Sequence, residues 1–194
     1  MQKIIASDFD GTITTKDTLL EFIRYAKGNM RFAFGFMLYS PLLVAMKLQL
    51  YPNWKAKQRI FSYFFRGMDI TRFDALCRSF AESHRHLVRP GALEMLRKAE
   101  VEGTQVVIVS ASIDNWVQPF FPTLTVAGTR IEVTDGIITG RFTTPNCYGE
   151  EKVVRLKALF PQRESYQLTA YGDSRGDKEL LEYADERHYK PFRS

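Results

Sequence analysis

Two carboxylates near the start of the chain are placed where they could share one divalent cation. Asp8 and Asp10 follow the short apolar run Ile4-Ile5-Ala6-Ser7 and are followed at once by Gly11 and Thr12. Residues two apart on a regular strand point to the same side, and two carboxylates in one small space repel each other. Mg²⁺, which prefers oxygen ligands, would neutralise them. An ordinary Asp-Gly turn after a strand is the alternative that these residues alone leave open.

Further polar residues follow other apolar runs. Ser110 comes directly after Val106-Val107-Ile108-Val109, Lys152 stands near the start of a predicted helix, and Asp173 and Asp177 follow the run 167–171. Taken singly, each has a plain structural interpretation as a helix-approach, surface or first-turn residue. Parallel strands present ligand sites at their carboxyl ends. The joint occurrence of these groups therefore predicts a phosphoryl-transfer site, where cations offset carboxylate and phosphate charge.

Strands that alternate with helices predict an α/β fold built on a parallel sheet. The hairpin signal is Asp135-Gly136, between two alternating runs. We expect strands near 4–7, 104–109, 124–127, 167–171 and 187–189, a hairpin over 131–142, and helices over 90–101, 150–160 and 174–183, with another helix starting at 113.

A long helical pattern interrupts this alternation after the first strand. Asp17, Asn53 and Asp69 are each placed to cap a helix within it. The pattern predicts two domains: an α/β core formed by residues 1–13 and 86–194, and a helical cap formed by residues 14–85. An insert that begins and ends near the site is well placed to act as a lid.

Composition and termini indicate an intracellular protein. The chain has 194 residues, enough for one good core and a small second one. Its two cysteines, Cys77 and Cys147, lie far apart and suggest no disulfide framework. Met1-Gln2-Lys3 runs straight into the first strand, so we expect no signal peptide and a cytoplasmic location.

The positive charge is concentrated in the predicted cap. Residues 20–66 hold eight Lys or Arg and one acid, Glu21, within a chain whose net charge is +5. A basic segment beside an anion site favours an anionic substrate or an anionic membrane surface. Nucleic acid is not expected as a partner, because the usual nucleic-acid-binding motifs are missing.

These motifs together resemble those of the haloacid dehalogenase superfamily. Asp8-Phe9-Asp10-Gly11-Thr12 is similar to its first motif, Ser110 to the second, Lys152 to the third, and Asp173 with Asp177 to the fourth. The helical insert after the first motif is similar to the C1-type cap of the phosphoserine-phosphatase-like branch. The resemblance implies a Rossmann-like three-layer core with an inserted α-helical cap.

The resemblance also implies a role for each motif residue. Asp8 would attack phosphorus and form an aspartyl-phosphate, while Asp10 would act as general acid and then general base. Mg²⁺ would be held by Asp8, the Asp10 carbonyl and Asp173, and Asp177 would support the metal or orient Lys152.

The phosphate group has its own set of expected partners. They are the backbone of the first loop, the second motif and the lysine: Gly11, Thr12, Ser110, Ala111 and Lys152. The acid two residues after the nucleophile favours phosphatase or phosphotransferase chemistry, since related dehalogenases lack it and transport ATPases have a lysine there.

The substrate is less well defined by the sequence. In phosphoserine phosphatases an acid at the position of Asp17 binds the substrate amine, and a cap arginine, for which Arg59 is the candidate, binds the carboxylate. This favours a small phosphorylated metabolite, although an Asp before a helix is also a common N-cap.

The apolar stretch 32–50 suggests another substrate. Its uncharged run of 15 residues, 32–46, is too short to span a bilayer, for which about 20 are needed. It is either the packed core of the cap or a membrane-facing surface flanked by Arg24, Lys27, Arg31 and Lys47. The layout is similar to phosphatidylglycerophosphatase-type relatives, which would make the substrate a lipid phosphate and the protein peripheral at the inner face of the membrane. A catalytically silent phosphate-binding protein is the remaining alternative.

Overall fold

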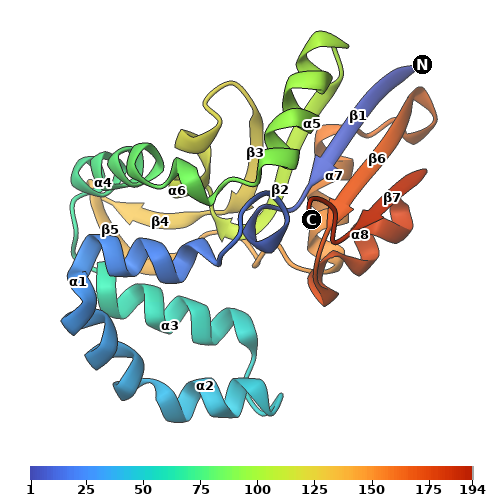
Figure 1. Cartoon of the computed structure of the whole chain (residues 1–194). Helices are drawn as coiled ribbons and strands as arrows, with labels where there is room; N and C mark the ends of the chain where they lie inside the picture. Colours follow the sequence, from blue (N-terminus) through green and yellow to red (C-terminus); the bar gives the residue numbers. More distant parts are fainter. Residues whose placement is uncertain (194) are drawn as a thin grey trace.

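The centre of the molecule is a five-stranded sheet in which every pairing is parallel. The structure is a computed structural model that describes residues 1–193. The strand order is β3-β2-β1-β6-β7 (Figure 1). The strands are β1 (Gln2–Ser7), β2 (Gln105–Ile113), β3 (Thr125–Thr129), β6 (Tyr166–Gly172) and β7 (Glu186–Tyr189).

Helices cover both faces of this sheet and make a three-layer core. The side chains of β2 alternate: Val107 and Val109 pack with Leu156 of α7, whereas Ile108 packs on the opposite face with Ala92 of α5. The flanking helices are α5 (Pro90–Val101) and α6 (Asp114–Val117) on one side and α7 (Glu150–Leu159) and α8 (Lys178–Tyr183) on the other. The predicted three-layer α/β fold is confirmed.

The register of the central strands gathers the predicted motifs at one edge. Ser7 of β1 pairs with Ile108 of β2 and with Tyr171 of β6. The next residue, Asp8, donates its backbone N–H to the Tyr171 carbonyl at 2.9 Å. The three loops that carry the motifs therefore leave the sheet together.

Four helices are inserted between β1 and α5, and they lie to one side of the sheet (Figure 1). The two connections to them lie side by side, since Thr14 and Val88 form an antiparallel bridge. The inserted helices are α1 (Thr18–Leu38), α2 (Ser40–Lys47), α3 (Asn53–Phe65) and α4 (Ile70–Ser83).

Two of the three predicted caps are confirmed. Asp17 accepts the Leu19 N–H at 2.9 Å, and Asp69 accepts the Arg72 N–H at 3.0 Å. The prediction for Asn53 is wrong: Asn53 is the first residue of α3, the N-cap is Pro52, and no side chain caps this helix.

The predicted hairpin is confirmed as β4 (Ile131–Thr134) and β5 (Ile137–Phe142). Its turn residues Asp135 and Gly136 both have positive φ, 51° and 78°, as this tight turn requires. The hairpin packs on the inserted helices: the Phe142 N–H donates to Gln58 Oε1 at 3.0 Å. The hairpin lies outside the range 14–85 predicted for the cap, and its packing on the cap helices was not predicted.

Short turns complete the fold. The first, η1 (Phe9–Ile13), carries the first motif, and Gly11 within it has a φ of 78°. The others are η2 (Arg85–Leu87), η3 (Gln118–Phe120), η4 (Arg163–Ser165) and η5 (Arg175–Asp177). Among residues 1–193, no helix has both the length and the apolar character needed to cross a bilayer.

An aromatic cluster joins the inserted helices to the sheet domain. The ring centroid of Phe22 in α1 lies 5.1 Å from that of Trp116 in α6 and 5.3 Å from that of Phe80 in α4. Phe65 and Phe73 approach Phe22 at 5.4 and 5.5 Å. All five side chains are fully buried, so the two parts share one apolar core.

This shared core predicts a large cost for removing its central ring. Phe22→Ala should lower the free energy of unfolding by about 3–5 kcal/mol, because it leaves a cavity among four aromatic side chains. Urea denaturation measures the change. Met37→Ala, at a side chain that is 66% exposed, should stay within about 0.5 kcal/mol. Equal effects of the two variants would contradict a core centred on Phe22.

Candidate active site

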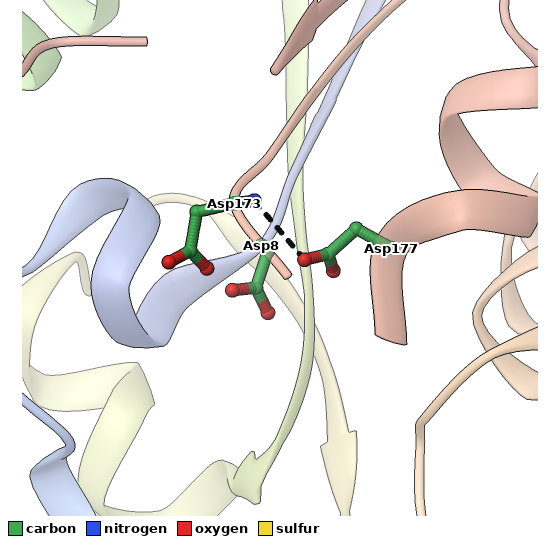
Figure 2. Close-up of side chains that lie close together, drawn as sticks. All are labelled: Asp8, Asp173 and Asp177. Carbon is green, nitrogen blue, oxygen red and sulfur yellow. Dashed lines mark hydrogen bonds between the residues drawn. The ribbon is translucent and has the colours of Figure 1, made fainter. Parts of the chain in front are cut away.

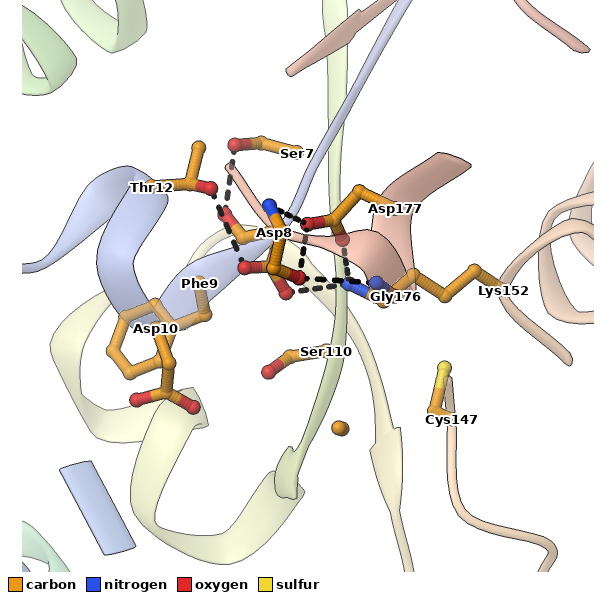
Figure 3. A network of polar contacts seen from close by, with 12 residues as sticks. Ser7, Asp8, Phe9, Asp10, Thr12, Ser110, Cys147, Lys152, Gly176 and Asp177 are labelled. Atoms are coloured by element: carbon orange, nitrogen blue, oxygen red, sulfur yellow. Dashed lines mark hydrogen bonds and ion pairs between the residues drawn. The ribbon is translucent and has the colours of Figure 1, made fainter. Parts of the chain in front are cut away.

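The centre of the site is a buried lysine held between two carboxylates. Lys152, in the first turn of α7, is 2% exposed. Its Nζ lies 2.5 Å from Asp8 Oδ1 and 2.6 Å from Asp177 Oδ1 (Figure 3). Because a lone buried charge is strongly disfavoured, Lys152 can be charged here only with these partners.

Asp177 is itself fixed by the loop that follows β6. Its Oδ2 accepts the backbone N–H of Asp173 at 3.1 Å, and the N–H and hydroxyl of Ser174 at 2.9 and 2.8 Å. Its Oδ1 accepts from Lys152. Both oxygens of Asp177 are thus engaged by the protein, and its contacts are those of a residue that orients the lysine.

One cation between two carboxylates leaves an excess negative charge in the site. Lys152 and the hydrogen bonds from Ser174 outweigh burial and hold the pKa of Asp177 below its usual value. Burial raises the pKa of Asp8 to about 7, although Lys152 opposes the shift. The two carboxylates in turn outweigh burial and raise the pKa of Lys152. Asp8 is therefore the group that most needs a further positive charge.

A divalent cation fits beside Asp8. Oxygens of Asp8, Asp173 and Asp177 lie within 4.8 Å of one another (Figure 2). Carboxylate oxygens are the donors that Mg²⁺ prefers. Gly11 allows the close approach, since a Cβ there would lie 2.6 Å from Asp173 Oδ2. Asp177 already accepts four hydrogen bonds, whereas the side chains of Asp8 and Asp173 accept two each, so Asp8 and Asp173 have more acceptor capacity left for direct ligation.

The C-terminal segment reaches the same cluster. Arg193 Nη2 lies 2.5 Å from Asp173 Oδ2, and Thr12 Oγ1 donates to the other oxygen of Asp173 at 3.4 Å. The guanidinium thus places a positive charge on one of the two carboxylates suited to bind a cation.

Asp10 occupies a separate environment, turned away from this cluster (Figure 3). Its Oδ1 accepts the backbone N–H and the hydroxyl of Thr18 at 2.7 and 2.6 Å, and its Oδ2 accepts the Ser112 hydroxyl at 2.5 Å. Trp116 Nε1 donates to the Thr18 hydroxyl at 3.2 Å. Thr18 and Ser112 were not predicted as site residues; their only signal was a hydroxyl directly after Asp17 and another two residues after Ser110.

The predicted phosphate-binding residues lie around one cavity of about 460 Å³. Gly11, Ser110, Ala111 and Lys152 line it together with Asp8, Asp10 and Asp173. Thr12 is fully buried beside the carboxylates, where its one hydroxyl proton is shared between Asp8 Oδ2 at 3.3 Å and Asp173 Oδ1 at 3.4 Å. The structure thus gathers the residues of all four motifs at one place.

The two predicted substrate residues, Asp17 and Arg59, lie in different places relative to the cavity. Asp17 lines the cavity, and it also caps α1. Arg59 does not reach the cavity: it is exposed on α3, where its Nε donates to the Tyr51 hydroxyl at 3.1 Å. This position gives no support to the predicted contact of Arg59 with a substrate carboxylate.

Lys57, two residues earlier, is the α3 cation that lines the cavity, and its Nζ donates to the Ala111 carbonyl. Burial lowers the pKa of Lys57, while Asp10 and Asp17 oppose that shift. The signal was present in the sequence, because Lys57, Ile60, Phe61 and Phe64 follow the i, i+3, i+4, i+7 spacing of one helix face. A lysine on an otherwise buried face needs an anionic or polar partner.

Comparison with known proteins extends this picture. A family model described as haloacid dehalogenase-like hydrolase matches residues 5–182. Protein CicA of Caulobacter vibrioides (strain NA1000 / CB15N) is 37% identical over 196 residues, and the match covers 98% of this chain and 86% of CicA.

Solved structures share the fold. A Bordetella pertussis Tohama I protein described as of unknown function superposes with a TM-score of 0.83 at 18% identity, covering 96% of this chain and 89% of that one. A structure described as a phospho-aspartyl intermediate analogue of phosphoserine phosphatase gives a TM-score of 0.60 at 17% identity, with 96% and 85% covered. At these identities the likeness concerns the fold alone.

The excess charge at Asp8 predicts that the site lowers the stability of the metal-free protein. The pKa of Asp8 in the folded state, about 7, lies above its ordinary 3.8. Ionised Asp8 therefore opposes folding, increasingly from about pH 4 to pH 7 and fully above that. With EDTA present, Asp8→Asn should raise the free energy of unfolding by about 2–4 kcal/mol near pH 8. This gain in stability should vanish toward pH 4.

Thermal denaturation across this pH range measures the effect. Asp135→Asn, the same chemical change at the exposed hairpin turn, is the matched control and should show no such pH-dependent gain. A destabilised Asp8→Asn protein at pH 8 would show that Lys152 needs both carboxylates.

The contact of Arg193 predicts competition with a metal ion. Arg193→Ala should bind Mg²⁺ more tightly, by up to about fivefold, because a half-exposed ion pair contributes at most about 1 kcal/mol. Isothermal titration calorimetry reports the affinity directly. Arg187→Ala, which removes an exposed arginine of β7, controls for net charge, and equal affinity in both variants would exclude direct competition.

Proposed function

The chain belongs to the haloacid dehalogenase-like hydrolase family, and we propose that within it the protein is a Mg²⁺-dependent phosphomonoester hydrolase. The observation that carries the proposal is the contrast between two carboxylates of one loop. Asp8 is buried against Lys152, whereas Asp10 is held by hydroxyls at the cavity. Different environments for two nearby carboxyls allow one to act as nucleophile and the other as acid and base.

Mg²⁺ would be held by carboxylate oxygens of Asp8 and Asp173, with the Asp10 carbonyl as the further protein ligand that the family resemblance implies. When bound, it supplies positive charge for the transferring phosphoryl group. Asp177 acts through Lys152, which it positions with a 2.6 Å contact.

The first half-reaction uses the carboxylate of Asp8. One of its oxygens forms a bond to phosphorus while the bond from phosphorus to the substrate alcohol oxygen breaks. Asp10 gives its proton to that leaving oxygen, so that an alcohol departs and an aspartyl-phosphate remains. Ser110, Lys152 and the backbone at Gly11 and Thr12 bind the phosphoryl oxygens.

The second half-reaction reverses the role of Asp10. Its carboxylate takes a proton from water, the water oxygen bonds to phosphorus, and the bond to Asp8 breaks to release inorganic phosphate. Thr18 and Ser112 suit this task because three hydrogen bonds of 2.5–2.7 Å fix the Asp10 carboxyl in both steps. The aromatic core supports Thr18 through Trp116.

The substrate is either a small phosphorylated metabolite or a lipid phosphate. A phosphoserine-like ligand would meet Asp17 and Lys57, but not Arg59. The wall of the cavity that the inserted helices provide is largely apolar, and includes Leu19, Leu20, Phe36, Leu43, Met46 and Ile60. This wall specifically favours the second candidate, a phosphomonoester with an apolar alcohol portion.

Phosphate release in the presence of Mg²⁺ tests the function. The panel should hold phosphoserine, sugar and nucleotide monophosphates, p-nitrophenyl phosphate and a phosphatidyl monoester in detergent. Asp8→Asn should abolish turnover because it lacks the attacking oxygen, and Asp10→Asn should lower it by about 10²–10⁴-fold. Asp135→Asn should leave it unchanged.

Turnover that survives in Asp8→Asn would exclude Asp8 as the nucleophile. Folded wild-type protein that binds Mg²⁺ and turns over nothing on the panel would favour the silent phosphate-binding alternative. Acid quench during turnover should trap phosphate on the wild-type chain and not on Asp8→Asn.

A further inference from the structure

Two of the inserted helices expose a series of large apolar side chains. Met30, Met37 and Leu48 are 87, 66 and 63% exposed. Met30, Phe34 and Met37 follow one another at four- and three-residue spacing along α1, and Val44 and Leu48 are four residues apart at the end of α2. We refer to the exposed side chains Met30, Phe34, Met37, Leu38, Val44 and Leu48 as the outer apolar row.

The opposite side of the same helices is already packed. Phe32, Phe36 and Leu43 pack against the aromatic core, and Gly35 is buried against the Phe64 ring. A surface helix normally presents polar residues to water on the side away from the core. Here α1 beyond Gly28, and α2, are apolar on both sides, at the edge of the molecule farthest from the sheet (Figure 1).

The positive charge near the outer apolar row indicates what kind of surface would cover it. Residues 22–68 contain eight Lys or Arg and not one Asp or Glu. Lys27 and Arg31 border a surface hollow together with Met30 and Phe34, and Lys47 ends α2. A second copy of the chain would bring two such basic faces together, which electrostatic repulsion opposes. An apolar surface flanked by Lys27, Arg31 and Lys47 complements an anionic bilayer.

The outer apolar row adjoins the active-site cavity. Phe36 of α1, and Leu43 and Met46 of α2, line the same cavity as Asp8 and Asp10. The same two helices therefore present apolar side chains outward to solvent and inward to the substrate. A phosphomonoester with its alcohol portion in a bilayer would have apolar side chains of these two helices to contact within the cavity that holds the carboxylates.

We propose that the outer apolar row docks the protein on the surface of an anionic bilayer, where it acts on the phosphate group of a membrane lipid. The docking stands on the exposed side chains and the charge of the cap. The substrate class rests on the phosphomonoesterase activity proposed above. The two parts can be tested separately, because docking needs no turnover.

Vesicle flotation tests the docking. Three vesicle types are compared: phosphatidylcholine alone, phosphatidylcholine with phosphatidylglycerol, and phosphatidylcholine with phosphatidic acid. The wild-type protein should float with both anionic types and not with the neutral one, and salt should weaken binding. A triple variant, Phe34→Gln, Met37→Gln and Val44→Gln, should bind at least about tenfold more weakly, since buried apolar area drives the insertion.

A matched triple variant controls for exposed apolar loss in general. Val101→Gln, Val154→Gln and Leu159→Gln alter exposed apolar side chains on α5 and α7, and this protein should bind vesicles like the wild type. Both triple variants should hydrolyse p-nitrophenyl phosphate at the wild-type rate. Only the first should lose hydrolysis of phosphatidic acid in vesicles.

Each outcome decides one part of the proposal. Absence of wild-type binding to anionic vesicles, or equal binding by the two triple variants, would overturn the docking. A dimer in sedimentation equilibrium that the first triple variant converts to monomer would make the row a self-interface instead. Asp8→Asn should bind vesicles normally, so failure of the catalytic proposal leaves docking intact. Normal docking with phosphate release from soluble esters alone would overturn the lipid substrate.

Discussion

The buried ammonium of Lys152 between Asp8 and Asp177 is the interaction on which the rest of the site depends. Three charged groups with almost no exposure to water can coexist only if their geometry is fixed. The fold provides that geometry from three places: the end of β1, the first turn of α7, and the loop after β6. Together Lys152, Asp8 and Asp177 carry a net charge of −1, which attracts a cation and makes the metal-free site unfavourable.

The aromatic core supplies the second constraint, since it links the inserted helices to the sheet domain. Phe22 packs directly on Trp116, and Trp116 donates to Thr18, which in turn holds Asp10. The orientation of Asp10 thus depends on how α1 packs against α6 of the sheet domain. A lid that moved as a rigid unit would have to separate these buried rings from one another, at a cost of several kcal/mol. This packing opposes motion of the whole insert as one rigid body.

Much of the fold could be predicted because its signals are local. Strand-helix alternation and the Asp135-Gly136 turn specify elements, and the carboxyl ends of parallel strands bring the motifs together wherever the helices lie. Contacts across the chain could not be predicted in this way. Ser112 meets Asp10 only because β2 continues past Ser110 to Ile113. Arg59 and Lys57 differ only in which side of α3 they occupy, and that depends on which face α3 buries.

The kink at Gly28 separates two tasks that one helix performs. Gly28 has a φ of 78°, and no atom lies within 4 Å of where its Cβ would be, so backbone conformation and not space calls for glycine here. Before the kink, α1 positions Thr18 and packs Phe22 in the core. After it, α1 supplies Phe36 to the cavity and Met37 to the outer surface. Gly28 therefore divides α1 into a first part that fixes the orientation of Asp10 and a second part whose side chains face the cavity and the outer surface.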